Sequence, residues 1–175
     1  MNEDQMKQHA LELAGIYYSL LEDTRFVKHD PDAHNVCSAV VQPMGGGPTE
    51  TFYSYSNISA LKAQKYQKYN WVTGEEGAKI INRGGFQDYH TEVRLINALY
   101  AKGKMVDGTV IFFFSSRTVC NTCRPAIFTA MQVLQGRVGF MAFEFKVEQH
   151  GTLTDNIYPI HRNANQHHGG INYEM

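Results

Sequence analysis

The sequence predicts an α/β protein in which five strands form a mixed sheet with helices packed against it. Two long segments repeat apolar residues at helical spacing, and five shorter runs are rich in apolar, β-branched or aromatic residues. Along the chain they follow the order helix, strand, strand, helix, strand, helix, strand, strand, with an extra short helix before the second long one. Alternation of this kind is typical of layered α/β domains.

A helix and a hairpin open the chain. Apolar residues recur at helical spacing over 6–21, and this pattern stops before Pro31. Two strand-like runs follow at 36–42 and 51–56. The connection between them is rich in glycine, which predicts a β-hairpin.

The middle of the chain predicts two helices separated by an irregular stretch. Residues 58–69 have a helical pattern, and 71–87 are irregular and rich in glycine. Residues 90–102 place apolar side chains on one helical face, with Asp88 as the expected N-cap.

A buried strand and another helix come next. Residues 109–114 (TVIFFF) are continuously apolar, which is typical of a strand buried on both faces. Residues 121–134 can form a helix if Pro125 lies in its first turn.

Two strands close the predicted sheet, at 137–147 and 157–160. The link at 148–156 is too short for a crossover helix. We therefore expect these two strands to pair antiparallel.

Length and charge limit the classes of protein to consider. The 175 residues fit a single domain over 1–175, with its core at about 6–161 and a polar tail at 162–175. The formal charge of −1 excludes a strong general attraction to nucleic acid, so any such affinity must be local. The N-terminus is acidic where a signal peptide needs positive charge, and no apolar run approaches the roughly 20 residues of a membrane span. We expect neither a signal peptide nor a membrane span.

Two short motifs lie at the predicted starts of two helices, one on each side of the buried strand. His90 and Glu92 form an H-x-E motif, and Cys120 and Cys123 form a C-x-x-C motif. Cysteines at i and i+3 in a first helical turn project to one side, and the helix dipole favours their thiolates. Together with a histidine they leave the fourth position of tetrahedral zinc open, as catalytic zinc sites do. Glu92 is then the expected proton carrier.

Alternatives to this catalytic site remain. A structural zinc site could be closed by Cys37 as a fourth ligand, and a C-x-x-C redox pair would leave His90 and Glu92 unexplained. We favour the open site because Cys37 falls in a predicted strand, where a thiol more often packs as a small apolar side chain. Either motif alone arises often by chance, but their combination at two helix starts does not.

Two segments, HTEVRLINALY (90–100) and FFFSSRTVCNTCRPAI (112–127), resemble the zinc-dependent cytidine deaminase superfamily, whose signature is H-x-E followed by P-C-x-x-C. Val119 stands where the family usually has proline. Divergent bacterial toxin deaminases also lack the proline at this position. The resemblance implies a cytidine-deaminase-like three-layer fold, with a five-stranded mixed sheet flanked by helices. Because the link at 148–156 is too short for a helix, the chain is similar to the branch of the superfamily whose last two strands are antiparallel. That branch includes free-nucleoside deaminases and many bacterial polymorphic-toxin deaminases.

The resemblance also implies roles for individual residues. It assigns Zn²⁺ to three ligands, which are His90, Cys120 and Cys123. Glu92 moves protons in the hydrolytic deamination of cytosine to uracil, so the chain would be a hydrolase acting on a C–N bond of a cyclic amidine. Ser115 and Ser116 are placed to meet the exocyclic amine, and Asn57 to contact the sugar. All three are equally well explained as ordinary polar residues at strand ends.

The stretch 61–71 bears on the substrate. It interleaves cations and aromatic rings, which are Lys62, Lys65, Lys68, Tyr66, Tyr69 and Trp71. Cations beside rings that stack on bases are typical of single-stranded nucleic-acid binding, so Trp71 is a predicted substrate-binding residue. The alternative is a solvated lysine face on a helix whose aromatic side is core. The aromatic residues of 51–56 are likewise either pocket walls or core.

We therefore predict a bacterial toxin-like enzyme that converts cytosine to uracil in single-stranded DNA, and duplex DNA stays open as a second substrate. Free cytidine or deoxycytidine, RNA and adenine stay open as substrates, as does an inactive deaminase-fold module that binds nucleic acid or protein. Thiolate ligands fit a reducing cytoplasm, either of the producing cell or of a target cell that receives a secreted toxin. We expect a monomer, and for a toxin an immunity protein as partner.

Overall fold

Helices and strands alternate along the chain as the sequence predicts. The computed structural model describes residues 1–24, 35–56, 61, 63–73, 79–81, 90–116, 123–145 and 158–160. The regular elements in these ranges are α1 (Glu3–Thr24), β1 (Val36–Gln42), β2 (Glu50–Tyr55), the 3₁₀ helix η4 (Gln64–Tyr66), α2 (Thr91–Ala101), β3 (Val110–Ser115), α3 (Cys123–Leu134), β4 (Gly139–Glu144) and β5 (Tyr158–Pro159). The predicted α/β class is confirmed. Over the described ranges, no helix combines the length and apolarity that a membrane crossing requires.

One mixed sheet carries the fold, with the strand order β2-β1-β3-β4-β5. β1 runs antiparallel to both β2 and β3, whereas β3 and β4 are parallel. β5 runs antiparallel to β4, and in the described residues it pairs with β4 at two positions. In the described part of the chain, four strands of six or seven residues make up the body of the sheet. The short fifth strand predicted over 157–160 corresponds to the two-residue β5, and residue 157 lies outside the described residues.

The β1–β2 hairpin sets the ends of three strands side by side. β1 spans the predicted residues 36–42, and β2 begins one residue earlier than predicted. In the connection, Gly45 and Gly46 have φ values of 85° and 77°, which other residues seldom adopt. Because β1 is antiparallel to both neighbours, its first residue lies beside the last residues of β2 and β3.

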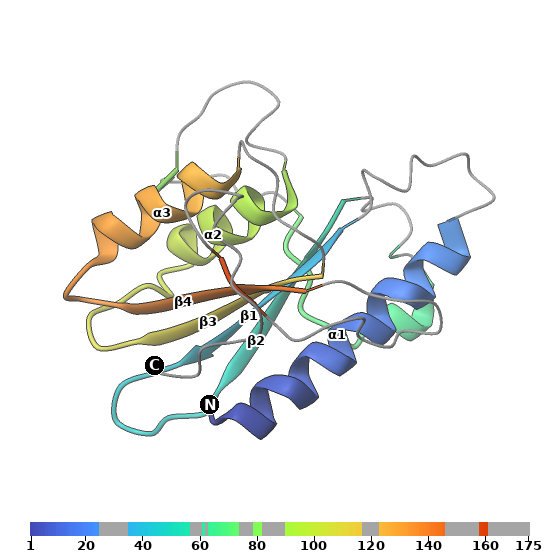
Figure 1. Ribbon diagram of the computed structural model, residues 1–175, viewed down its shortest axis with the longest axis horizontal. Helices are drawn as coiled ribbons and strands as arrows, with labels where there is room; N and C mark the ends of the chain where they lie inside the picture. The colour runs from blue at the N-terminus through green and yellow to red at the C-terminus, as the bar shows by residue number, and fades with distance from the viewer. Residues whose placement is uncertain are drawn as a thin grey trace.

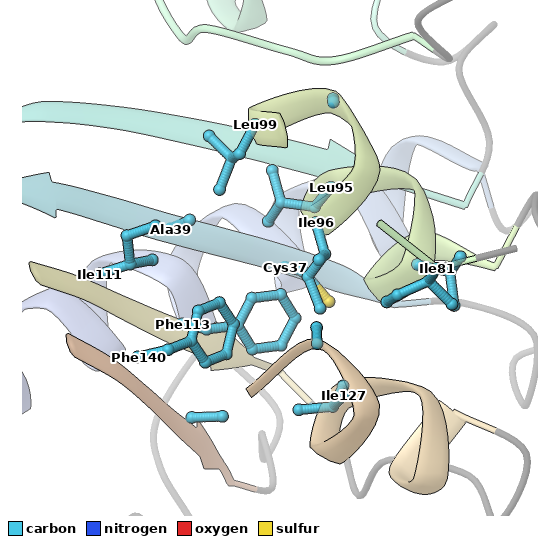
Figure 2. Close-up of a cluster of buried hydrophobic side chains, with 14 of the residues drawn as sticks. Cys37, Ala39, Ile81, Leu95, Ile96, Leu99, Ile111, Phe113, Ile127 and Phe140 are labelled. Atoms are coloured by element: carbon cyan, nitrogen blue, oxygen red, sulfur yellow. The ribbon is translucent and has the colours of Figure 1, made fainter. Parts of the chain in front are cut away.

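Helices cover both faces of the sheet. Figure 1 shows α2 and α3 on one face and α1 across the other. β3 is buried on both sides, as predicted, because successive strand residues face opposite directions. Ile111 and Phe113 pack under α2 and α3, in the apolar cluster drawn in Figure 2, whereas Phe112 and Phe114 pack in the cluster under α1.

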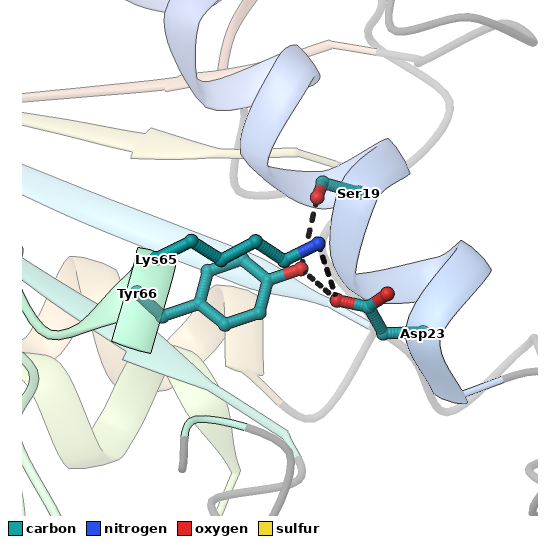
Figure 3. A network of polar contacts seen from close by, with 4 residues as sticks. All are labelled: Ser19, Asp23, Lys65 and Tyr66. Carbon is teal, nitrogen blue, oxygen red and sulfur yellow. Dashed lines mark hydrogen bonds and ion pairs between the residues drawn. The ribbon is translucent and has the colours of Figure 1, made fainter. Parts of the chain in front are cut away.

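The prediction of an α-helix over 58–69 is wrong within the described residues 61 and 63–69. There the structure has 3₁₀ geometry, at residue 61 and over the three-residue η4. Contacts with α1 hold this turn. Tyr66 donates a hydrogen bond to Asp23, Ser19 Oγ lies 2.9 Å from the Tyr66 hydroxyl, and Lys65 pairs with Asp23 at 2.9 Å (Figure 3). Tertiary contacts therefore outweigh the helical pattern here.

The N-cap of α2 and the extent of β4 differ from the predictions, and the predicted start of α3 lies outside the described residues. His90, with φ −60° and ψ 140°, is the N-cap of α2, in place of the predicted Asp88, which lies outside the described residues. β4 is shorter than the predicted 137–147, because Arg137 donates its N–H to Leu134 in the turn after α3. α3 begins at Cys123 and has Pro125 in its first turn, as predicted, while 121–122 lie outside the described residues.

Candidate active site

Chain segments far apart in sequence meet at one edge of the sheet. β3 and β4 end side by side there, with Ser115 level with Glu144. His90 and Cys123 belong to the starts of α2 and α3, the two helices that pack on the same face. The carboxyl ends of parallel strands are where α/β proteins generally place their sites.

His90, Glu92 and Cys123 are brought together at this edge. His90 Nδ1 lies 3.1 Å from Cys123 Sγ, and that sulfur lies 3.5 Å from Glu92 Oε2. Glu92 and Cys123 are both buried. Two motifs separated by a strand in the sequence therefore form one cluster. Cys120, the remaining predicted ligand, lies outside the described residues.

The two described residues of the predicted ligand set have a spacing that fits a zinc ion. With usual Zn–N and Zn–S bond lengths, the two donor atoms of a tetrahedral site are about 3.5 Å apart. His90 Nδ1 and Cys123 Sγ are within a few tenths of an ångström of that separation. Across the described ranges no group of three or more His, Cys, Asp or Glu side chains could hold a metal ion, so the ligand set depends on Cys120.

Asn35 completes the cluster and is a residue that sequence reasoning missed. Its Nδ2 donates to Glu92 Oε1 at 2.7 Å, and its Oδ1 accepts from Ser116 Oγ at 2.9 Å. Asn35 comes just before β1, and a polar residue at that place in a sequence is usually taken for an ordinary loop residue. The signal that could have found it is the antiparallel pairing of β1 with β3, which places it beside Ser115 and Ser116.

Ser115 and Ser116 lie at the site and are buried. Ser116 Oγ accepts a hydrogen bond from Val36 N at 3.0 Å, and Ser115 Oγ lies 3.2 Å from Asn35 Nδ2. Their hydroxyls tie the ends of β1 and β3 together, as ordinary strand-end residues do. Contact of either serine with a substrate amine stays a prediction.

Cys37, the spare cysteine, packs in the core. Figure 2 shows it among the apolar side chains of Ile96 and Phe113, and it is fully buried. Burial raises the pKa of the Cys37 thiol well above its usual value, and the nearby Glu92 carboxylate raises it further. A neutral thiol packs as a small apolar group, which favours the core position over a fourth zinc ligand.

The structure does not bring Trp71 to this cluster. Its indole N–H donates to Tyr66 O at 2.8 Å, and its ring packs against Tyr53 and Tyr69. The aromatic residues of β2 are buried, and Phe52 also lines a surface hollow. Asn57, the other predicted substrate contact beyond the serines, lies outside the described residues.

A surface hollow of about 590 Å³ lies beside β2. Tyr69 and Trp71 line it together with Lys102 and Lys104, two cations that follow the last turn of α2. Lys104 also pairs with Glu50 at 2.9 Å. The aromatic residues of the 61–71 stretch thus meet cations from a different part of the chain.

A buried ion pair fixes the start of α3. Arg124, directly after Cys123, points its Nη2 at both carboxylate oxygens of Glu144, at 2.9 and 3.0 Å. Arg124 is 1% exposed and Glu144 is 2% exposed. Sequence reasoning missed this pair. An arginine in a first helical turn opposes the helix dipole, and that conflict is the signal that a nearby carboxylate compensates.

No protein-family model, curated protein or solved structure matches this chain. The class of protein is therefore defined by the fold and the site alone. It is an α/β protein with a mixed sheet and a partly buried His–Cys–Glu cluster at the carboxyl ends of two parallel strands.

Proposed function

We propose that this chain is a zinc-dependent deaminase of the cytidine deaminase superfamily that converts cytosine to uracil in DNA. One observation carries the proposal: His90 Nδ1, Cys123 Sγ and Glu92 Oε2 are linked by separations of 3.1 and 3.5 Å at the start of two neighbouring helices. A histidine that only packs in the core, or a C-x-x-C motif that arose by chance, would not explain why the Glu92 carboxylate lies beside the other two groups.

The residues divide the chemistry between them. His90, Cys123 and Cys120 would hold zinc, which when bound acts as a Lewis acid and makes water nucleophilic at neutral pH. Glu92 would accept one proton from the attacking water and give it to the ring nitrogen. It would then accept the second proton from the hydroxyl formed at C4 and give it to the leaving amine. Overall, water is consumed and ammonia leaves, and the carboxylate ends in its starting state. The position of Glu92 Oε2, 3.5 Å from Cys123 Sγ, supports this role.

A polynucleotide substrate is supported by the hollow beside β2. Lys102 and Lys104 can neutralise phosphates there, and Tyr69 and Trp71 provide ring surface. Lys102 is ten residues along α2 from Glu92, a rise of about 15 Å. A strand whose target cytosine enters the site could therefore extend to the hollow within a few nucleotides. The bacterial toxin type, with an immunity protein, is part of this proposal by resemblance alone.

The test is to incubate the protein with single-stranded DNA, duplex DNA, RNA and free cytidine, and to measure uracil. We expect uracil from single-stranded DNA. Product from free cytidine alone would overturn the proposal that DNA is the substrate. Absence of product from all four substrates would overturn the proposal that the chain is a deaminase.

Glu92→Ala is the first variant to measure. We expect uracil formation to fall below about 10⁻³ of wild type because the proton carrier is lost, while zinc content and thermal unfolding stay near wild type. Glu12→Ala, which removes an exposed carboxylate of α1, is the matched control and should retain full activity. Retained activity in Glu92→Ala would contradict the mechanism.

A further inference from the structure

We propose that Asn35 is a positioning residue of this site, whose side-chain amide holds Glu92 Oε1 so that Oε2 is the oxygen that carries the proton. The contact itself is independent of the reaction, and the assignment of Oε2 rests on the proposed function.

The amide of Asn35 is engaged at both ends. Nδ2 lies 2.7 Å from Glu92 Oε1, with Ser115 Oγ at 3.2 Å and Cys37 Sγ at 3.4 Å, and Oδ1 accepts from Ser116 at 2.9 Å. The bond to Glu92 is the shortest of these. Because an ionised carboxylate only accepts hydrogen bonds, the atom that faces Oε1 must be the NH₂ group, which fixes the orientation of the amide.

The backbone of Asn35 is held as firmly as its side chain. Its N–H donates to Ser56 Oγ at 2.7 Å, and its carbonyl accepts from the same hydroxyl at 3.0 Å and from Ser56 N at 3.2 Å. The next residue, Val36, accepts a hydrogen bond from Ser116 N at 3.0 Å. The amide therefore stands between the ends of β2 and β3 in one place, before any substrate arrives.

A fixed amide removes the freedom that a glutamate otherwise has. A free Glu side chain samples several rotamers, and a proton carrier must stay within hydrogen-bond reach of the reacting atoms. With Oε1 bound to Asn35, Oε2 is directed to the Cys123 side of the cluster. Outer partners that orient a reacting group typically change activity 10- to 100-fold when they are removed.

The kinetic test uses Asn35→Leu, which keeps the shape of the side chain and removes its hydrogen bonds. On single-stranded DNA we expect kcat to fall about 10- to 100-fold with KM within twofold and zinc content unchanged. The matched control is Asn97→Leu, since Asn97 is another buried amide that makes two hydrogen bonds, both to the backbone of Ile81. It should lower the melting temperature and leave kcat near wild type.

A binding measurement separates positioning from substrate contact. In the inactive Glu92→Ala background, adding Asn35→Leu should leave the Kd for a cytosine-containing single strand unchanged. A weaker Kd there, a change in KM alone, or an unchanged kcat in the single variant would each overturn the positioning role.

An NMR measurement tests the contact without any activity. The side-chain NH₂ of Asn35 should give a resonance that shifts in Glu92→Ala and stays in place in Glu12→Ala. No shift in Glu92→Ala would overturn the contact, even if Asn35→Leu does not fold. If the wild-type chain makes no uracil, the assignment of Oε2 fails with the proposed function, and the NMR result still decides the contact.

Discussion

Single buried polar residues determine how this protein responds to its surroundings. His9 of α1 is buried against β1 and β3, with Nε2 2.7 Å from Ser38 Oγ and its ring centroid 4.8 Å from that of Phe114. Burial lowers the pKa of His9 from 6.5 to about 4. The folded protein therefore keeps this ring neutral under conditions in which the unfolded chain protonates it.

His9 predicts a loss of stability in mild acid. Between pH 6.5 and 4 the unfolded chain binds a proton that the folded protein does not, so the free energy of unfolding falls as the pH falls through this window. The contribution is fully present above pH 6.5, and its loss approaches about 3 kcal/mol near pH 4.

Urea unfolding at pH 7.5 and pH 4.5 measures this effect. His9→Gln should lose about 2 kcal/mol less than wild type between the two values, because glutamine does not titrate. Equal losses in the two proteins would assign the pH dependence to other groups.

At the scale of elements, the Arg124–Glu144 pair joins the first turn of α3 to the end of β4. Both groups are removed from water, so each depends on the other for compensation of its charge. Cys123 precedes Arg124, and the pair therefore sets the position of the predicted ligand.

Removal of one partner should be costly. We expect Glu144→Met to lower the free energy of unfolding by about 3–5 kcal/mol, since it leaves the Arg124 charge buried without its carboxylate. This corresponds to a melting temperature roughly 10 °C lower. The double variant Arg124→Met/Glu144→Met should recover most of that loss.

The exposed pair between Lys7 and Glu3 of α1, at 3.2 Å, is the matched control. Lys7→Met should change the free energy of unfolding by less than about 1 kcal/mol because solvent screens this pair. A Glu144→Met variant as stable as Lys7→Met would show that the buried pair does not hold α3.

At the scale of the whole molecule, the proposed nucleic-acid binding requires a local surface because the formal charge is −1. Two lysines of the 61–71 stretch already contact other residues of the chain. Lys65 pairs with Asp23, and Lys68 lies over the ring of Tyr69. The structure shows a second candidate surface, which is the hollow beside β2 that Lys102, Lys104 and Trp71 line together.

Lys102→Ala tests this surface. It should weaken binding to single-stranded DNA severalfold and reduce the slope of log Kd against log salt by about 0.7, because one phosphate contact is lost. Arg137→Ala removes an exposed cation beside β4, which β1 and β3 separate from β2 in the sheet, and should change neither value. Equal effects of the two variants would mean that the hollow is not the binding surface.

The sequence alone determined the α/β class and the places of most elements. Strong periodicity marked α1 and α2, and runs of β-branched and aromatic residues marked β1 and β3, because local patterns report which face of an element is buried. The sequence pattern also indicated that His90, Glu92 and Cys123 lie at helix starts.

Only the tertiary structure decided what depends on distant pairing. It replaced the predicted helix over 58–69 with η4, since contacts with α1 hold that turn in the described residues. It placed Asn35 against Glu92, 57 positions away, and Arg124 against Glu144. The physical reason is that a buried polar group must find a partner wherever the fold brings one, and no local pattern records which residue that will be.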